Sequence, residues 1–538
     1  MQEGCVPWPA RLADRYRSAG YWTGETLADL VRAPAISTPH HPALVTGDDR
    51  IGYAALDARI DRFAAGLRAL GVTAGDRVVV QLPNGIEFVV SCLALFRLGV
   101  LPVLALPAHR RHEIAYLCEH AGAVALLIPD VYRRFDYREM AREVRSACRS
   151  LAQVVVSGDA AEFVAFDEVD GEPVPLPRPA PSDAAMLLLS GGTTGAPKLI
   201  PRTHDDYAYQ LRATAAEVGF GPDGVYLAAL PAAHNAALGC PGVLGALRAG
   251  GTAVLAGSPS PEEVFPLIAT ERVTLTTLMP TYLPVWMEAA PLFGADLSGL
   301  VIEVGGARID PELARRVEPE LGVVLTRWFG TAEGLLSFTR PGYPREIRVG
   351  TEGRPLSAGD ELRVVDADGR DVAPGQAGEL IVQGPTTLRG YYRAPEYNET
   401  AFTPDGFYRT GDLVTITGEG HLEVSGRIKD VVNRGGEKVP AGEVEAVLKA
   451  HHAVLDAAVL GVADAALGEK TCAFIVPAGG ASPDRRELRA FLRDRGLAEF
   501  KVPDRVELIA ELPHTPVGKV DKNALRAWLA QPADRKGP

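Results

Sequence analysis

The sequence predicts an α/β protein, with a large N-terminal region of mixed sheets and helices and a small α+β domain at the C-terminus. Three observations lead to this fold class. Helix-like and strand-like segments alternate through the first four hundred residues, which is typical of βαβ units around a parallel or mixed sheet. From about residue 355, short strand-like runs separated by Asp-Gly and Pro-Gly turns predict a β-rich subdomain. After residue 428 the pattern changes again, to a mixture of strands and helices of about the size of a minimal domain.

Individual segments show the alternation. Residues 53–71 and 85–99 carry the apolar spacing of helices, and residues 76–82 between them are typical of a strand. Near the C-terminus, residues 455–464 and 470–477 predict two further strands, and helix signals follow them.

The domain boundaries follow the changes in pattern. We place an N-terminal core at residues 1–428, with its β-rich subdomain at about 355–428, and a C-terminal domain at 429–538. The Pro-rich stretch 171–183 predicts an exposed connector inside the core.

Composition and charge argue against several classes of function. The chain has 538 residues and a formal net charge of −13, which disfavours a general nucleic-acid binder, because phosphate binding needs clustered Lys and Arg. The apolar run from Phe88 to Leu106 is interrupted by Arg97 and Pro102, so we expect a buried helix and a buried strand rather than a membrane span. The six cysteines form no C-x-x-C pair, and the first residues lack the apolar centre of a signal peptide. We therefore expect a cytoplasmic enzyme without a zinc site or disulfides.

A glycine-rich loop is the strongest local signal for chemistry. An apolar strand leads into a run that comprises Ser190, Gly191, Gly192, Thr193, Thr194, Gly195 and, after Ala-Pro, Lys198. Glycines let backbone amides approach an anion closely, and the hydroxyls and the lysine add donors and charge, so the loop suits a polyphosphate. The spacing differs from that of a Walker P-loop, because Lys198 follows a proline and precedes a leucine. A P-loop kinase is therefore a poor alternative.

This loop resembles the phosphate loop of the adenylate-forming superfamily, which holds acyl-CoA synthetases, peptide-synthetase adenylation domains and luciferases. More closely, the chain resembles the stand-alone aryl-acid adenylating enzymes, which activate 2,3-dihydroxybenzoate or salicylate. The runs that carry this resemblance are, in order, LIPRTHDDY, YLAALPAAHN, PGVLGAL, SPSPEEVFPLI, FGTAEGL and NRGGEKVPAGEVE. They extend over essentially the whole chain. The resemblance implies the fold predicted above, with a mobile C-terminal domain.

The resemblance also implies which residues surround the nucleotide. Phe329 would stack on adenine, and Glu333 would orient Mg²⁺. Asp412, in the run Y-R-T-G-D, would accept hydrogen bonds from the two ribose hydroxyls. Arg427 would contact the nucleotide. The other implied members of the ATP site are Gly306, Ala307, Gly330 and Thr331.

Two lysines carry the implied chemistry of the C-terminal part. Lys519, in the run P-H-T-P-V-G-K-V, would bridge the substrate carboxylate and the α-phosphate, two anions whose repulsion otherwise opposes their approach. Lys429 would be the hinge about which the small domain turns before the second step. A pantetheine thiol would then enter beside Gly435 and Gly436.

The implied acid pocket has features of its own. His234 and Asn235 resemble the motif of the aryl-acid branch, in which the amide binds a hydroxyl ortho to the carboxylate, whereas amino-acid-activating relatives carry Asp. Cys240 stands where Ser would hold a second ring hydroxyl, so it favours an unsubstituted or apolar 3-position. Ala236 and Ala237 replace a usual aromatic residue and Pro. The space would admit an alkylated salicylate or a bicyclic hydroxy acid, or alternatively another side chain fills it. The pocket is completed by Gly305, Gly306 and Leu336.

These assignments together predict an aryl acid-AMP ligase. It would adenylate an ortho-hydroxy aromatic acid with ATP and Mg²⁺, release pyrophosphate, and transfer the aryl group to the phosphopantetheine of a separate aryl carrier protein, in siderophore or nonribosomal peptide biosynthesis. We expect no nucleic-acid or membrane partner. The main alternative is an aryl-CoA ligase that uses coenzyme A as the acceptor. A second alternative is an inactive acid-binding scaffold, which the complete set of charged motif residues argues against.

Overall fold

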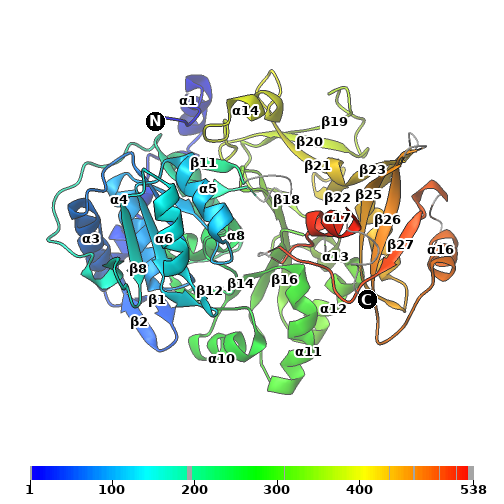
Figure 1. Cartoon of the computed structure of the whole chain (residues 1–538), viewed down its shortest axis with the longest axis horizontal. Helices are drawn as coiled ribbons and strands as arrows, with labels where there is room; N and C mark the ends of the chain where they lie inside the picture. Colours follow the sequence, from blue (N-terminus) through cyan, green and yellow to red (C-terminus); the bar gives the residue numbers. More distant parts are fainter. Residues whose placement is uncertain are drawn as a thin grey trace. The chain divides into compact units, whose positions relative to one another are not determined.

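The computed structural model describes residues 3–190, 197–307, 309–434, 437–464, 467–495, 497, 499–515 and 518–530. The chain divides into two compact units (Figure 1). Unit 1 comprises Met1–Glu361 and Gln383–Tyr408, and unit 2 comprises Leu362–Val382 and Arg409–Pro538. Unit 2 thus takes in most of the predicted β-rich subdomain together with the C-terminal part. Compactness alone does not locate the residue about which a chain turns, so the boundary at residue 429 stays a prediction.

Unit 1 contains a nine-stranded sheet with the order β18-β17-β16-β15-β14-β12-β13-β1-β2. Its strands are β1 (Pro42–Thr46), β2 (Asp49–Gly52), β12 (Val225–Ala228), β13 (Thr252–Leu255), β14 (Leu275–Leu278), β15 (Val301–Gly305), β16 (Val324–Gly330), β17 (Leu336–Phe338) and β18 (Arg354–Pro355). The strands from β16 to β1 pair in parallel, whereas β2, β17 and β18 are antiparallel to their neighbours. The carboxyl ends of the parallel strands therefore meet at one edge, which is where α/β sheets bind ligands.

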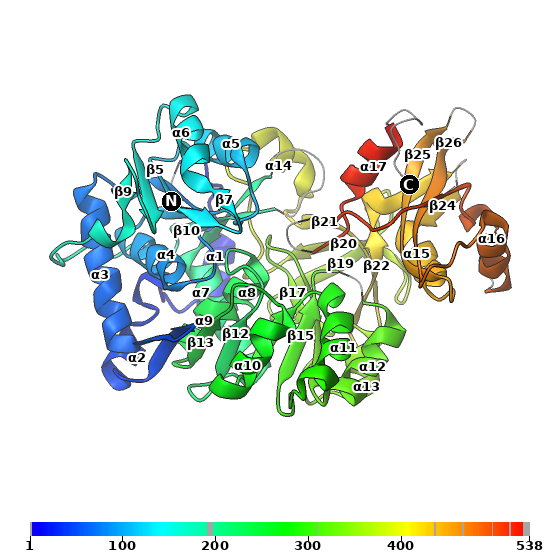
Figure 2. The ribbon, with the colours of Figure 1, turned by 60° about the horizontal axis from the view of Figure 1, so that its bottom comes forward.

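Helices cover this sheet (Figure 2). One face packs in a core that includes Trp286, Ile302 and Val304, together with helices α10 (Pro261–Glu271), α11 (Leu283–Phe293), α12 (Pro311–Leu321) and α13 (Arg345–Gly350). Outside that core, α9 (Gly242–Arg248) lies against β12 and β13, and it contacts α7 (His204–Glu217) and α8 (Asn235–Gly239). In the strand β15, Ile302 and Val304 face this apolar core, and the residues that alternate with them lie on the opposite face of the sheet.

A seven-stranded sheet of unit 1 has the order β11-β10-β4-β3-β5-β8-β9. Its strands are β3 (Arg77–Val80), β4 (Leu101–Leu104), β5 (Ala125–Pro129), β8 (Gln153–Ser157), β9 (Val164–Ala165), β10 (Ala184–Leu189) and β11 (Leu199–Thr203). Helices α5 (Arg111–Ala121) and α6 (Tyr137–Ala147) pack on one face, and α4 (Ile86–Leu98) lies against β3 and β4 beside α3 (Tyr53–Ala69). The remaining elements of unit 1 are α1 (Ala10–Ser18), α2 (Arg32–Ser37), α14 (Pro395–Ala401), the short hairpin β6 (Val131–Tyr132) and β7 (Phe135–Asp136), and three single turns of 3₁₀ helix, Leu27–Asp29, Phe166–Glu168 and Pro280–Tyr282.

Unit 2 contains a four-stranded sheet, β19-β20-β21-β22, and a sheet with the order β24-β23-β26-β25, in which β27 also pairs with β26. The strands are β19 (Glu361–Val365), β20 (Gly378–Gln383), β21 (Tyr408–Ile416), β22 (Leu422–Arg427), β23 (Val431–Arg434), β24 (Glu437–Pro440), β25 (Val454–Asp464), β26 (Gly468–Pro477) and β27 (Arg505–Leu508). Its helices are α15 (Ala441–Lys449), α16 (Arg485–Asp494), α17 (Lys522–Ala530) and two 3₁₀ turns, Ile428–Asp430 and Glu499–Lys501.

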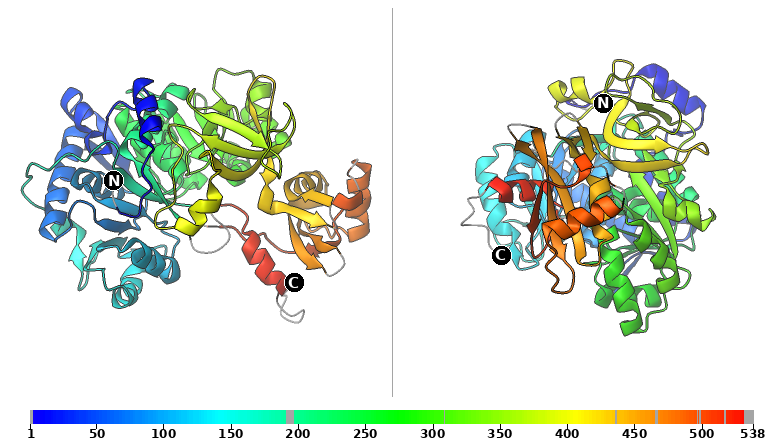
Figure 3. Two further views of the ribbon diagram at one scale, coloured as in Figure 1. Left: turned by 90° about the horizontal axis from the view of Figure 1, so that it is seen from above. Right: turned by 90° about the vertical axis from the view of Figure 1, so that its right-hand side faces the viewer.

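The long hairpin β25–β26 packs against helices on both faces (Figure 3). On one face Val459 and Ile475 pack with α15 and α16, and on the other Leu460 and Phe474 pack with α17. Because successive residues of a strand point to opposite faces, a nearly continuous apolar run is what such a strand requires.

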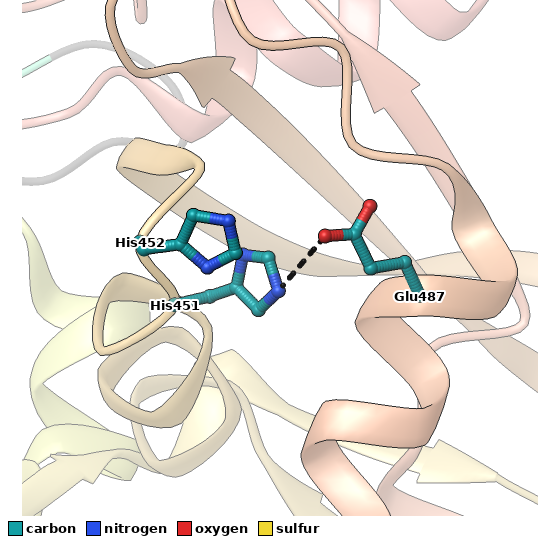
Figure 4. A group of neighbouring side chains, drawn as sticks. All are labelled: His451, His452 and Glu487. Atoms are coloured by element: carbon teal, nitrogen blue, oxygen red, sulfur yellow. Dashed lines mark ion pairs between the residues drawn. The ribbon is translucent and has the colours of Figure 1, made fainter.

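A cluster of two histidines and a glutamate joins the end of α15 to α16 (Figure 4). His451 is buried, its Nδ1 accepts a hydrogen bond from the Ala453 amide at 3.2 Å, and its Nε2 lies 3.4 Å from a carboxylate oxygen of Glu487. The ring also packs edge-on against Phe491. Both ring nitrogens of His451 therefore have protein partners, and the cluster ties the turn after α15 to the helix α16.

The predicted fold class is confirmed, and so are the segments that predicted it. The predicted helix at residues 53–71 is α3, which ends at Ala69, and the apolar run after Phe88 divides into α4 and β4. The interrupting Arg97 is buried and forms a salt bridge with Asp61 at 2.7 Å. Residues 171–183 contain neither helix nor strand. Within the described residues, no helix has the length and apolar character that a membrane crossing would need.

Candidate active site

The end of β15 brings two predicted glycines to the edge of the nine-stranded sheet. Gly305 pairs with Trp328 of β16, and a Cβ on Gly305 would collide with the Trp328 indole. Gly306 has a φ of +75°, which favours glycine, and a Cβ there would crowd Met279. Both positions thus need glycine for local reasons, and the backbone that leads to Ala307 comes close to the end of the neighbouring strand.

The strand β16 carries the next predicted segment to the same edge. Phe329 is half-buried and pairs with Ser337, and Gly330 pairs with Leu336. The Thr331 amide then donates to the Leu335 carbonyl at 3.1 Å and closes a tight turn. Phe329 points away from the face that its neighbour Trp328 occupies, because side chains alternate along a strand.

Glu333 lies just after this turn and is 8% exposed. The Tyr391 hydroxyl donates to a carboxylate oxygen of Glu333 at 2.8 Å and lies 3.0 Å from the Tyr408 hydroxyl. Burial and the Glu333 carboxylate raise the pKa of Tyr391, so its phenol stays a donor. The Nζ of Lys198 lies 3.9 Å from the ring centre of Tyr397 and 5.8 Å from that of Tyr391. Tyr391 therefore lies near both Lys198, the predicted phosphate-binding lysine, and Glu333, the predicted metal-binding carboxylate.

Two hydrogen bonds join the ends of the predicted phosphate loop. The Ser190 amide donates to the Lys198 carbonyl at 2.9 Å, and the Lys198 amide donates to the Ser190 hydroxyl at 3.0 Å. The predicted members between them, Gly191, Gly192, Thr193, Thr194 and Gly195, lie outside the described residues.

A buried polar network surrounds the predicted acid-binding residues. The Tyr207 hydroxyl donates to the Asn235 amide oxygen at 2.8 Å, and the Asn235 nitrogen lies 3.8 Å from the Cys240 sulfur. Gln210 also approaches the Cys240 sulfur, at 3.7 Å. His234 is the N-cap of α8, and its Nδ1 accepts a hydrogen bond from the Ala236 amide at 3.3 Å. The orientation of Asn235 is thus fixed by protein groups on both ends of its amide.

A buried arginine holds this network from behind. Arg202 is fully buried and forms a salt bridge with Asp206 at 2.8 Å. It also donates to the Gln210 side chain at 2.9 Å and stacks on the Tyr207 ring at 4.9 Å. A buried charge is stable only when it is paired, so the salt bridge with Asp206 holds Arg202 in place. Arg202 in turn positions Tyr207 and Gln210, which contact Asn235 and Cys240.

An apolar cluster adjoins the network. Its members are Ala236, Cys240, Trp328, Leu336 and Phe338, with Leu356 packed against them. Three of the predicted acid-pocket residues are therefore neighbours, although they come from α8, the turn after it and β17. Burial raises the pKa of the Cys240 thiol, which leaves it a small neutral group rather than a nucleophile.

Unit 2 holds the other predicted residues. Asp412 of β21 pairs with Arg427 of β22, and the Arg427 Nε lies 2.9 Å from an Asp412 oxygen. Lys519 ends a short turn, in which its amide donates to the Thr515 hydroxyl at 3.1 Å and its carbonyl accepts from the Thr515 amide at 2.6 Å. Lys429 lies in the 3₁₀ turn Ile428–Asp430. The predicted Gly435 and Gly436 lie outside the described residues.

The sequence did not indicate the side chains that orient Glu333 and Asn235. Tyr391 is 58 residues from Glu333 along the chain, and Tyr207 is 28 residues from Asn235. The predicted site also did not include Glu303, a buried acid in β15. The charged residue in the otherwise apolar run V-I-E-V-G is the signal that could have indicated Glu303.

Known protein families and relatives match this chain over nearly its full length. A family model described as AMP-binding enzyme matches residues 31–392, and one described as AMP-binding enzyme C-terminal domain matches residues 443–519. Triostin synthetase I of Streptomyces triostinicus is 53% identical over 99% of this chain and 100% of its own length. The 2,3-dihydroxybenzoate-AMP ligase of Bacillus subtilis (strain 168) is 52% identical over 99% of this chain and 98% of its own. The Mycobacterium smegmatis MbtA apo structure is 46% identical, with a TM-score of 0.77 and coverage of 97% of this chain and 98% of that one.

Proposed function

Because the chain belongs to the AMP-binding enzyme family, we propose that it converts an ortho-hydroxy aromatic acid into its acyl-adenylate and passes the acyl group to a carrier protein. The chain is an adenylating ligase that uses ATP. The choice of acid rests on the Asn235 amide, which Tyr207 holds beside Cys240. An amide can donate to and accept from a phenolic hydroxyl, whereas a substrate amine calls for a carboxylate. The relative that is named for 2,3-dihydroxybenzoate supports an acid of this class.

The size of the acid follows from the apolar cluster. Ala236 contributes only a methyl group there, and the thiol of Cys240 is a weak hydrogen-bond donor. The Cys240 thiol favours a salicylate-like acid over one with a second hydroxyl at the 3-position, and the small alanine supports a substituted or bicyclic ring.

In the proposed first step, a carboxylate oxygen of the acid attacks the α-phosphorus of ATP, and the bond to pyrophosphate breaks. Lys519 would bridge the carboxylate and the α-phosphate, two anions that repel one another. AMP is then a good leaving group, so the second step needs no enzyme nucleophile. The binding roles proposed for the other residues are phosphate contact by Ser190–Lys198, adenine stacking by Phe329, backbone packing by Gly305–Ala307 and Gly330–Thr331, and ribose and nucleotide contact by Asp412 and Arg427.

The residues around Glu333 fit a magnesium ion. Mg²⁺ prefers carboxylate oxygens and substrate phosphates, and Tyr391 is the only side chain that donates to Glu333 among the residues that the structure describes. When bound, the ion would neutralise charge on the phosphates, and Glu333 would hold it while Tyr391 fixes the carboxylate.

In the proposed second step, a thiolate attacks the acyl carbon of the adenylate, a thioester forms and AMP leaves. We propose that the small domain turns about Lys429 for this step, withdraws Lys519, and lets a phosphopantetheine thiol pass Gly435 and Gly436. We also propose that the protein works in the cytoplasm, since all six cysteines are free thiols.

Acid-dependent ATP–pyrophosphate exchange tests the first step. The panel would contain benzoate, salicylate, 2,3-dihydroxybenzoate, 6-methylsalicylate, 3-hydroxyanthranilate and 3-hydroxyquinaldate. We expect the highest kcat/KM for an acid with an ortho hydroxyl. Exchange with benzoate as fast as with every ortho-hydroxy acid would contradict the role of Asn235.

Separate assays of the two steps test Lys519 and the acceptor. We expect Lys519→Ala to lower the adenylation rate by about 10²–10³-fold and to spare acyl transfer from preformed adenylate. Equal loss of both steps would contradict the assigned role. Supplying preformed adenylate with coenzyme A or with a phosphopantetheinylated carrier then distinguishes an aryl-CoA ligase from the proposed function.

A further inference from the structure

Glu303 is a buried acid beside the proposed acid pocket, and the steps above do not use it. It lies in the middle of β15, and its side chain is 0% exposed. Ile302 and Val304 on either side of it pack in the apolar core with α11 and α12, so Glu303 projects from the opposite face of the sheet. Its cross-strand neighbours are Thr277 of β14 and Thr326 of β16.

Half of the Glu303 carboxyl is partnered. The Thr277 hydroxyl donates to Oε2 at 3.2 Å and itself accepts from the Tyr226 hydroxyl at 3.2 Å. Among the residues that the structure describes, Oε1 is buried and has no hydrogen-bond partner. Buried polar atoms of native proteins are almost always hydrogen-bonded, so Oε1 is suited to bind a water molecule or a ligand group.

A second buried donor on the same face also lacks a partner. Trp328 pairs with Gly305, two residues after Glu303, which places the indole diagonally across from Glu303. The Nε1 of Trp328 is buried and has no acceptor within the described part of the chain. Trp328 also belongs to the cluster with Ala236, Cys240 and Leu336. Two unpartnered polar groups on adjacent strands thus face the wall that these residues form.

The two groups are suited to bind acceptors. Burial raises the pKa of Glu303 to about 8, so the carboxyl is mostly protonated at neutral pH and Oε1 can carry the proton. The nearby titratable groups are Cys240 and Tyr226, whose pKa values are raised chiefly by burial, so both stay neutral. An indole nitrogen is a donor only. A molecule that satisfies both groups therefore presents acceptor atoms.

Resting on the proposed function, we infer that Glu303 and Trp328 bind a second polar group of the substrate, on the ring edge remote from the carboxylate. The substrate would then be an ortho-hydroxy aromatic acid, with a ring larger than one benzene, that carries a hydroxyl, alkoxy or ring-nitrogen acceptor on that edge. Asn235 recognises the ortho hydroxyl, Ala236 leaves room for the larger ring, and Glu303 determines specificity for the distal group.

Matched acids test this inference in the full-length protein. ATP–pyrophosphate exchange is measured with 3-hydroxy-2-naphthoate and 3,7-dihydroxy-2-naphthoate, and with 3-hydroxy-2-naphthoate and 3,5-dihydroxy-2-naphthoate. We expect the wild-type protein to prefer the more polar member of at least one pair by about ten-fold or more in kcat/KM, because a buried polar group left unpaired penalises the analogue that lacks its partner. Glu303→Leu should abolish that preference by lowering kcat/KM for the polar acid only, and Glu303→Gln should retain part of it, since an amide still donates.

Two controls keep the outcomes distinct. Ile302→Val, on the opposite face of the same strand, should leave the ratio between paired acids unchanged, and thermal unfolding shows whether each variant is folded. An unchanged ratio in folded Glu303→Leu, or no wild-type preference within either pair, would overturn the inference and leave a bridging water as the partner of Oε1. Absence of exchange with every aromatic acid would instead overturn the proposed function itself.

Discussion

Glu333 and Glu303 are both buried in unit 1, yet their surroundings prepare them for opposite tasks. Glu333 follows the end of β16, and a tyrosine hydroxyl donates to its carboxylate. Glu303 lies in the middle of β15, where Thr277 satisfies one oxygen and burial favours the protonated acid. In the roles proposed above, the first environment would present acceptor oxygens to a cation, and the second would present a donor to a substrate. The comparison indicates that the neighbours of a buried glutamate, and not its residue type alone, determine whether it is suited to a cation or to an acceptor group.

The largest effect is expected at Glu333. Glu333→Gln removes the charge that would hold Mg²⁺ but keeps an oxygen for Tyr391, so the fold should persist. We expect ATP–pyrophosphate exchange to fall by about 10²–10³-fold, with a weaker response to added Mg²⁺. Steady-state kinetics at several magnesium concentrations provide the measurement. Glu346→Gln, at an exposed position, is the matched control, and equal activity of the two variants would contradict the role of Glu333.

The pH dependence of stability tests whether Glu303 is protonated in the folded protein. Its pKa is about 8 in the folded protein against an ordinary value of 4.5, so the folded state binds more protons than the unfolded state between these pH values. Stability therefore decreases as pH rises through this window. The free energy of unfolding of Glu303→Gln minus that of the wild type should therefore increase by about 2 kcal/mol between pH 5.5 and 7.

Chemical denaturation at several pH values checks this expectation. Asp360, whose pKa burial raises to about 7, titrates in both proteins and cancels in the difference. A difference that does not change with pH would show that Glu303 is already ionised in the folded state.

A smaller effect is expected at Ala236, where the acid pocket is proposed to be enlarged. Ala236→Phe adds a ring to the cluster that contains Cys240 and Leu336. We expect kcat/KM for a bicyclic hydroxy acid to fall by about 10–100-fold, while salicylate changes by only a few-fold. A parallel loss for both acids would indicate general damage to the cluster, and an unchanged profile would show that Ala236 does not limit the acid.

The smallest effect is expected for Tyr391→Phe. The change removes one hydrogen bond to the Glu333 carboxylate and keeps the ring that lies near Lys198. We expect a loss of about 1.5–3 kcal/mol in unfolding free energy and less than the Glu333→Gln loss in activity. Tyr116→Phe, whose ring stacks on His120, is the control. Activity as low as that of Glu333→Gln would mean that Tyr391 does more than orient the carboxylate.

The sequence predicted the parts of the molecule that depend on neighbouring residues. The helix α4 and the strand β4, for example, follow from local apolar spacing. Partners that depend on the folded chain could not be predicted. Tyr391 and Glu333 are brought together by tertiary packing, and no periodicity in the sequence links them.

Along the strand β15, the residues that stabilise the core alternate with the residues that face the proposed acid pocket. Ile302 and Val304 serve the core, whereas Glu303 and Gly305 alternate with them on the other face. A duplicated gene could therefore acquire a new chemical preference through substitutions at alternate positions of a single strand, without repacking the helices behind it. Such interleaving would let selection for new natural products proceed while selection for a folded protein continues undisturbed.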